Sequence, residues 1–173
     1  MYIECTKKLS NAMKIKPNDI VPMRRVPFYE WHANLFMFER RKGVILMNNK
    51  IRYCIMLYGL KAEHFKNLDS IALAAIRETF LAEGFLEDKV DTYIANCGEV
   101  IYTKTHDRSI LSQITDFYCS ISWQIENYIP SDNINLVELN KWAGDLMCGT
   151  LGYAHPIDLL KKEMSEIDVE YLG

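Results

Sequence analysis

The segment of residues 31–36 carries two polar side chains that could take part in binding or catalysis. His32 and Asn34 are two residues apart in a run with the alternation of a β-strand, so they lie on the same face of it, about 7 Å apart. On a covered face they would need hydrogen-bond partners and would form a structural pair, which is the favoured interpretation. On an open face they would be displayed toward a ligand. We therefore keep His32 and Asn34 as candidate binding residues.

A second candidate site lies in residues 103–109, where an expected strand meets a long helix. The N-terminus of a helix offers unpaired backbone N–H groups, and Lys104, Arg108 and Ser109 stand beside it, which is an arrangement suited to an anion such as phosphate. The alternative is ordinary capping by Asp107 or Ser109, with Arg108 paired to a local acid. Capping is favoured, but the anion site stays open.

Basic residues are concentrated in the first third of the chain. Residues 1–61 hold twelve lysines and arginines against four acids, whereas the rest of the chain has a net charge of −11, for a total of −3. Arg40, Arg41 and Lys42 are consecutive within the basic part. The balance fits either charge complementarity between the two halves of the protein or a basic face for phosphate-bearing ligands.

Most catalytic templates are absent from the chain. It has no phosphate-binding glycine loop, no GxSxG motif and no HExxH motif. His106 and Asp107 are adjacent and so do not face one another as an acid–base pair. The four histidines show no metal-ligand spacing, so a metal site would require a tertiary coincidence, and we expect neither a metal nor a cofactor. The histidines are His32, His64, His106 and His155.

Three strands joined by tight turns are the clearest structural signal. They are expected over residues 31–40, 44–48 and 51–58, paired in order and antiparallel. The first turn suits a G1 bulge in which Gly43 takes a positive φ, and the second suits asparagine at residues 48–49. The third strand is apolar on both faces, which predicts a central position in the sheet.

Further strands near residues 2–5 and 99–104 complete the expected α+β fold, a mainly antiparallel sheet of four or five strands packed by helices. The helices are expected over residues 7–14, 69–83, 86–97, 109–129, 135–148 and 156–166. Residues 16–30 contain three prolines and are expected to be irregular. A boundary at residues 130–133 divides a core domain, residues 1–130, from a helical C-terminal segment, residues 131–173, that packs on it.

Length and composition indicate a soluble globular protein. The chain has 173 residues, and its apolar runs are too short to span a bilayer. The N-terminus lacks the apolar stretch of a secretory signal, and the five cysteines are widely spaced with no CxxC pair. Reduced thiols and a cytoplasmic location are therefore expected.

Several strings together resemble an uncharacterised bacterial family of domains of unknown function. They are the cysteine-to-leucine stretch of residues 5–9, WHANLF at 31–36, residues 40–42, GLKA at 59–62 and GEVIYTKTHDRS at 98–109. The resemblance covers roughly residues 1–125 and implies a bacterial cytoplasmic domain with no activity or catalytic residues to carry over.

The sequence favours a non-enzymatic binding module with a basic face near the sheet, whose partner is a protein or an anionic, phosphate-bearing ligand. The alternative is a small enzyme that acts on a phosphorylated or nucleic-acid substrate at a site formed by His32, Lys104 and Arg108.

Overall fold

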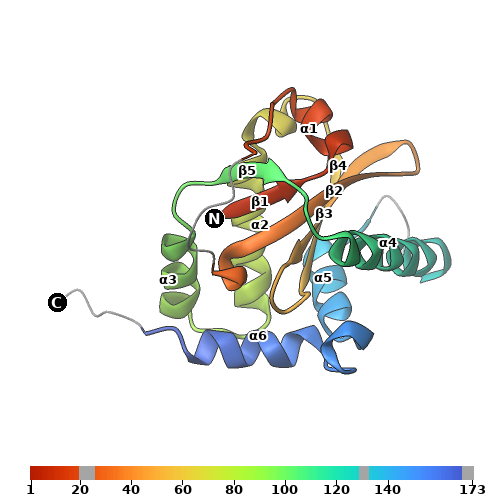
Figure 1. Ribbon diagram of the computed structural model, residues 1–173. Coiled ribbons are helices and arrows are strands. Elements are labelled where there is room, and N and C mark those ends of the chain that lie inside the picture. Colours follow the sequence, from red (N-terminus) through yellow and green to blue (C-terminus); the bar gives the residue numbers. More distant parts are fainter. Residues whose placement is uncertain (20–25, 129–132, 169–173) are drawn as a thin grey trace.

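Five strands form one sheet in the order β4-β3-β2-β1-β5 (Figure 1). The computed structural model describes residues 1–19, 26–128 and 133–168. The strands are β1 (Tyr2–Cys5), β2 (Glu30–Phe38), β3 (Arg41–Asn48), β4 (Cys54–Leu60) and β5 (Ile101–Lys104). All five lie close to the positions expected from the sequence.

Within the described residues, six α-helices and three short 3₁₀ helices connect and cover the strands. The α-helices are α1 (Lys7–Met13), α2 (Leu68–Ala82), α3 (Glu87–Cys97), α4 (Arg108–Tyr128), α5 (Leu136–Gly144) and α6 (Pro156–Ser165). The 3₁₀ helices are η1 (Pro27–Tyr29), η2 (His64–Asn67) and η3 (Gly149–Leu151). Thr6 and Asn135 cap α1 and α5 as expected, because each side-chain oxygen accepts a backbone N–H of the first turn.

The sheet is mixed, and the expectation of a mainly antiparallel sheet was wrong in this respect. Strands β2, β3 and β4 form the expected antiparallel meander, but β1 pairs in parallel with both β2 and β5. Parallel neighbours require a crossover between them. Helix α1 lies between β1 and β2 in the chain, and α2 and α3 precede β5, so the chain supplies these crossovers.

Strand β4 lies at the edge of the sheet, which corrects the central position expected from its apolar sequence. Its first four side chains are buried because helices cover both of its faces. A buried side chain also serves its outer edge, since the backbone N–H of Met56 donates to Oδ1 of Asn140 on α5 at 2.8 Å. The amide nitrogen of Asn140 in turn donates to the hydroxyl of Thr79 at 3.2 Å. A covered edge strand therefore has the same sequence pattern as a central one.

Both turns of the meander differ in detail from the expectation. The β2–β3 turn is formed by Glu39 and Arg40, which have positive φ, whereas Gly43 lies within β3. Gly43 is required for another reason, because a Cβ atom there would lie 2.9 Å from the carbonyl oxygen of Leu57. In the second turn the positive φ belongs to Arg52 and not to an asparagine.

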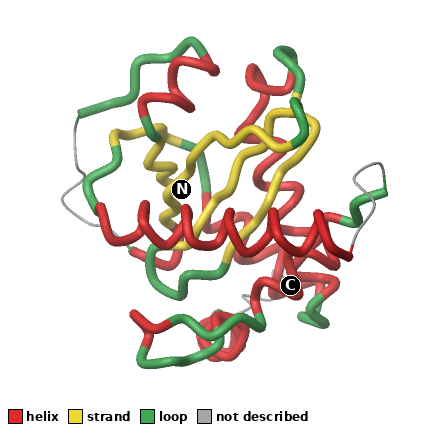
Figure 2. The backbone as a smooth tube through the Cα atoms, turned by 90° about the vertical axis from the view of Figure 1, so that its right-hand side faces the viewer, coloured by secondary structure: helices red, strands yellow, loops and turns green. Residues whose placement is uncertain are grey.

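Each face of the sheet has its own apolar core. One face packs mainly against α2, α3 and α6, and the other packs against α4 and α5. Figure 2 shows α4 lying across the strands on the second face. Helices α5 and α6 thus contribute to the cores around the sheet, while residues 130–132 of the expected domain boundary, like residues 20–25 of the proline-containing loop, lie outside the described residues.

All five cysteines carry free thiols. Among the described residues, no helix is long and apolar enough to cross a membrane.

Candidate metal centre

His32 lies beside Glu4 on the neighbouring strand, in the face of the sheet that also carries α4. The parallel register of β1 and β2 pairs Glu4 with His32. Their neighbours Ile3, Cys5, Trp31 and Ala33 belong to the core on the opposite face, so strand alternation directs Glu4 and His32 to this face. Both side chains are fully buried, and Oε2 of Glu4 lies 3.2 Å from Nε2 of His32.

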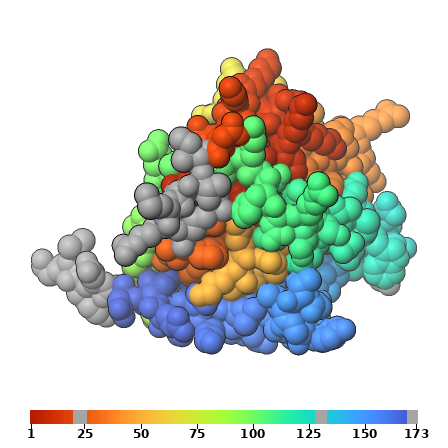
Figure 3. Space-filling model, viewed as in Figure 1, coloured from red at the N-terminus to blue at the C-terminus, as the bar shows by residue number. Residues whose placement is uncertain are grey.

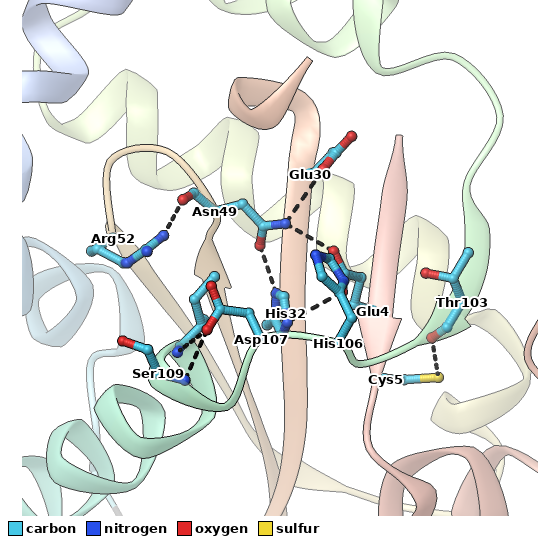
Figure 4. A network of polar contacts seen from close by, with 11 residues as sticks. Glu4, Cys5, Glu30, His32, Asn49, Arg52, Thr103, His106, Asp107 and Ser109 are labelled. Carbon is cyan, nitrogen blue, oxygen red and sulfur yellow. Dashed lines mark hydrogen bonds and ion pairs between the residues drawn. The ribbon is translucent and has the colours of Figure 1, made fainter. Parts of the chain in front are cut away.

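His106 joins this pair from the segment between β5 and α4. Strand β5 lies next to β1, and its last residue, Lys104, is in register with Cys5, so the chain leaves β5 close to Glu4. Nδ1 of His106 contacts Oε2 of Glu4, and the rings of His106 and His32 are 5.6 Å apart between centroids. The side chain of His106 is 54% exposed and forms the solvent side of the cluster (Figure 4).

Asn49, in the turn between β3 and β4, holds both buried members of the cluster. Its amide nitrogen donates to Oε1 of Glu4 at 2.9 Å and lies 3.4 Å from Oε2 of Glu30. Two carboxyl groups on this side fix the orientation of the amide, because a flipped amide would direct its oxygen at them. The amide oxygen of Asn49 therefore faces Nδ1 of His32, at 2.7 Å.

This contact determines the tautomer of His32. An amide oxygen can only accept, so Nδ1 of His32 carries the hydrogen and Nε2 is the ring nitrogen that faces Glu4. Nε2 pairs with the carboxylate when the ring is protonated and offers a lone pair when the ring is neutral. Burial lowers the pKa of His32, with the Asn49 hydrogen bond and Glu4 opposing that effect. The neutral imidazole with an available Nε2 is the form that ligates metal ions.

The three side chains meet the geometric requirement of a metal centre. One donor atom from each of Glu4, His32 and His106 lies within 4.8 Å of the other two. Zinc binds nitrogen and oxygen ligands at about 2.0–2.2 Å, so tetrahedral ligand atoms are roughly 3.4 Å apart. The 3.2 Å between Oε2 of Glu4 and Nε2 of His32 is close to that spacing.

Two further charged groups lie near the cluster, the buried Glu30 and the partly buried Arg52. Glu30 begins β2 on the same face and is buried, so a second carboxyl group lies near the candidate ligands. Nη1 of Arg52 donates to the backbone carbonyl of Asn49 and supports the turn that carries the amide. Burial lowers the pKa of Arg52 as well.

The other residues that the sequence put forward do not join His32. Asn34 forms a structural pair, since its side-chain oxygen accepts from the hydroxyl of Thr6 at 2.8 Å. Lys104 pairs with Asp19, and Asp107 caps α4 by accepting from the N–H of Ser109 at 2.8 Å.

Arg108 is an exposed residue in the first turn of α4. Arg40, Arg41 and Lys42 lie at the far end of β2 and β3, six residues along β2 from His32 and therefore roughly 20 Å away. Arg40, Arg41 and Lys42 thus belong to a different part of the molecule from His32.

The sequence carried weak signals for the residues that were missed. Glu4 is an acid inside a short apolar strand, where alternation places it between two core positions. His106 lies far from Glu4 and His32 in the chain, and its neighbour Asp107 is not part of the cluster. The pairing of β1 with β5, which brings His106 to Glu4, has no local sequence signal.

Comparison with known proteins yields a family but no activity. Neither a curated protein nor a solved structure is significantly similar to the chain. The resemblance to a family of unknown function is confirmed, and it extends beyond the residues first identified. A family model matches residues 2–159, and the chain belongs to that family, the domain of unknown function DUF6933.

Proposed function

We propose that this protein binds one divalent transition-metal ion between Glu4, His32 and His106. The observation that carries the proposal is the convergence of three donor atoms from three separate segments, with two of the side chains fully buried. Folding brings these segments together around a carboxylate and two imidazoles, which is the tertiary coincidence that the histidine spacing alone did not predict.

The donor set points to a class of metal. Two imidazole nitrogens and one carboxylate oxygen suit Zn²⁺ or Fe²⁺, whereas Mg²⁺ and Ca²⁺ prefer oxygen ligands throughout. Structural zinc sites are closed by four protein ligands, and sites with three protein ligands are typical of catalysis. The half-exposed side of His106 gives solvent access to the remaining position.

A metal centre of this kind favours the alternative that the protein is a small enzyme. Its site would consist of Glu4, His32 and His106 and not of His32, Lys104 and Arg108. A zinc ion held by Glu4, His32 and His106 would lower the pKa of a bound water and supply a nucleophile, so hydrolysis would be the reaction class that this arrangement suits best. His32 would act as a ligand, held in the required tautomer by Asn49. Lys104 and Arg108 have no part in this proposal.

A second candidate function uses the same residues without a metal. The carboxylate of Glu4 contacts Nδ1 of the half-exposed His106, as a buried acid does when it orients a general base. The two functions differ in a single measurable property, the affinity for metal ions.

A zinc competition titration tests the proposal. Untagged protein is stripped with a chelator, and its affinity for Zn²⁺ is measured against a chromophoric chelator for the wild type, Glu4→Gln and His106→Ala. We expect one Zn²⁺ per chain and at least a tenfold loss of affinity in both variants. His155→Gln changes a histidine outside the cluster and serves as the matched control.

Absence of zinc binding in the wild type, with folded protein by circular dichroism, would remove the metal centre and leave the Glu4–His106 acid–base pair. Zinc binding that is equal in all four proteins would place the metal elsewhere and also overturn the proposal.

A further inference from the structure

A basic hollow lies beside the β2–β3 hairpin, far from the candidate metal centre. It has a volume of about 530 Å³. Four cationic side chains and no acidic ones belong to its lining, namely those of Arg40, Arg41, Lys42 and Lys61. The hairpin projects from the body of the molecule (Figure 3), so these side chains are accessible.

The backbone explains why the four charges gather there. The two-residue turn at Glu39 and Arg40 leads directly into Arg41 and Lys42 at the start of β3. Lys42 pairs with Leu60 at the end of β4, where an irregularity in register separates it from Gly43. Lys61 follows Leu60, so the end of β4 brings a fourth cation to the charges of the hairpin.

These four cations form no ion pair with any described residue. Within the described parts of the chain, the ion pairs formed by lysine and arginine involve Lys50, Arg77, Lys104, Lys141 and Lys161. Lys42 lies over the ring of Phe65, 5.6 Å from its centroid, which orients its stem and leaves its charge at the surface. Like charges held together in this way favour an anionic partner.

The character of the hollow distinguishes between kinds of anion. A site for a single small anion needs buried donors around one point, whereas these cations are exposed around a wide, open hollow. A protein partner is usually anchored by aromatic side chains, and the lining has none. A chain of phosphates matches both the spread of the charges and the fork geometry of the two arginines.

We infer that the hollow formed by Met37, Arg40–Lys42 and Gly59–Ala62 binds the phosphodiester backbone of a nucleic acid, without reading its sequence. The lining contains no Asn, Gln or aromatic side chain, so its polar contacts come from the Arg and Lys charges, which bind phosphates of any sequence. Binding therefore depends on counterion release. Four contacts predict a slope of roughly −3 for log affinity against log salt on a single strand.

The test is fluorescence anisotropy with a labelled single-stranded oligonucleotide and its duplex, between 20 and about 200 mM salt. The charge-removal variant is Arg40→Gln/Arg41→Gln/Lys42→Gln/Lys61→Gln. The control variant removes four exposed charges outside the lining, Lys7→Gln/Lys8→Gln/Lys16→Gln/Lys162→Gln. We expect at least a tenfold loss of affinity in the first variant and less than a threefold change in the control.

Polyglutamate and pyrophosphate are included as competitors. The inference predicts that unlabelled oligonucleotide competes far better than either, per unit charge. Undetectable binding by the wild type at the lowest salt would overturn it, as would equal losses in the two variants. Equal competition by polyglutamate would replace the nucleic acid with an acidic polypeptide, and equal competition by pyrophosphate would replace it with a small anion. Because Glu4, His32 and His106 are unchanged in both variants, the result is independent of metal binding.

Discussion

The side-chain oxygen of Asn49 lies 2.7 Å from Nδ1 of His32, and this contact decides which ring nitrogen faces Glu4. The same amide donates to Glu4, so one residue in a turn orients two candidate ligands on two other strands. Groups in this position commonly tune a metal centre as strongly as some ligands do.

Replacing Asn49 should therefore weaken metal binding although Asn49 is not a proposed ligand. We expect Asn49→Ala to lower the affinity for Zn²⁺ by about 10–100-fold, because His32 loses the acceptor that holds its tautomer. Zinc competition measures the effect. Asn34→Ala, on the same strand as His32 but bonded to Thr6, is the control. Equal affinities for Asn49→Ala and the wild type would show that Asn49 has no positioning role.

Asn140 should be important for the edge of the sheet. Asn140→Ala leaves the buried N–H of Met56 without its acceptor, and a buried unsatisfied donor costs about 1–3 kcal/mol. Urea denaturation should show this loss of unfolding free energy. Asn127→Ala, an exposed asparagine on α4, should change stability by less than about 0.5 kcal/mol. A loss at Asn140 no larger than at Asn127 would contradict the role given to Asn140.

Replacing Gly43 by alanine, the residue with the smallest side chain, should destabilise the protein. A methyl group at this position meets the carbonyl oxygen of Leu57 at 2.9 Å, and both belong to paired strands that cannot separate freely. We expect Gly43→Ala to lower the unfolding free energy by about 1–3 kcal/mol. Gly149→Ala is the matched control, because its nearest neighbour is 4.0 Å away and its φ is not positive. A Gly43→Ala protein as stable as the control would disprove the close approach.

Titration of Glu83 should make the free energy of unfolding depend on pH in the acidic range. Burial is the main cause that raises the pKa of Glu83 above its ordinary value of 4.5, and its carboxyl accepts from the hydroxyl of Tyr53 at 2.5 Å. Above pH 4.5 the unfolded chain loses this proton before the folded protein does. Ionisation of Glu83 therefore lowers stability as pH rises through the window above 4.5.

Glu83→Gln removes this titration and keeps an acceptor for Tyr53. The stability of the variant relative to the wild type should increase from pH 4 to pH 7 in denaturation experiments. A difference that stays constant over that range would show that the carboxyl of Glu83 does not titrate abnormally.

The sequence predicted the elements of the fold better than their arrangement. Alternation located β2, β3 and β4, and the caps at Thr6 and Asn135 located two helix starts, because these signals are local. The parallel pairing of β1 with β2 and β5 depends on crossovers between distant segments, which leave no local pattern. The edge position of β4 was missed because Asn140, more than eighty residues away, serves its open side.

In the candidate site, too, the sequence predicted what has a local signal and missed what depends on pairing between distant segments. His32 was identified, since a histidine inside an apolar strand stands out locally. Glu4 and His106 become its neighbours only through the pairing of β1 with β2 and β5. Arg40, Arg41 and Lys42 were grouped because they are consecutive, and all three line one hollow. The contribution of Lys61 to the same hollow required the register of β3 and β4.

The most direct test of the metal centre is a cobalt titration of untagged, chelator-treated protein followed by visible absorption. Co²⁺ accepts the same ligands as Zn²⁺ and reports its coordination through its d–d bands. We predict that the bands saturate at one Co²⁺ per chain, disappear when Zn²⁺ is added, and are absent from Glu4→Gln but present in His155→Gln. A wild-type protein that develops no bands, or a Glu4→Gln variant with the bands of the wild type, would contradict the centre at Glu4, His32 and His106.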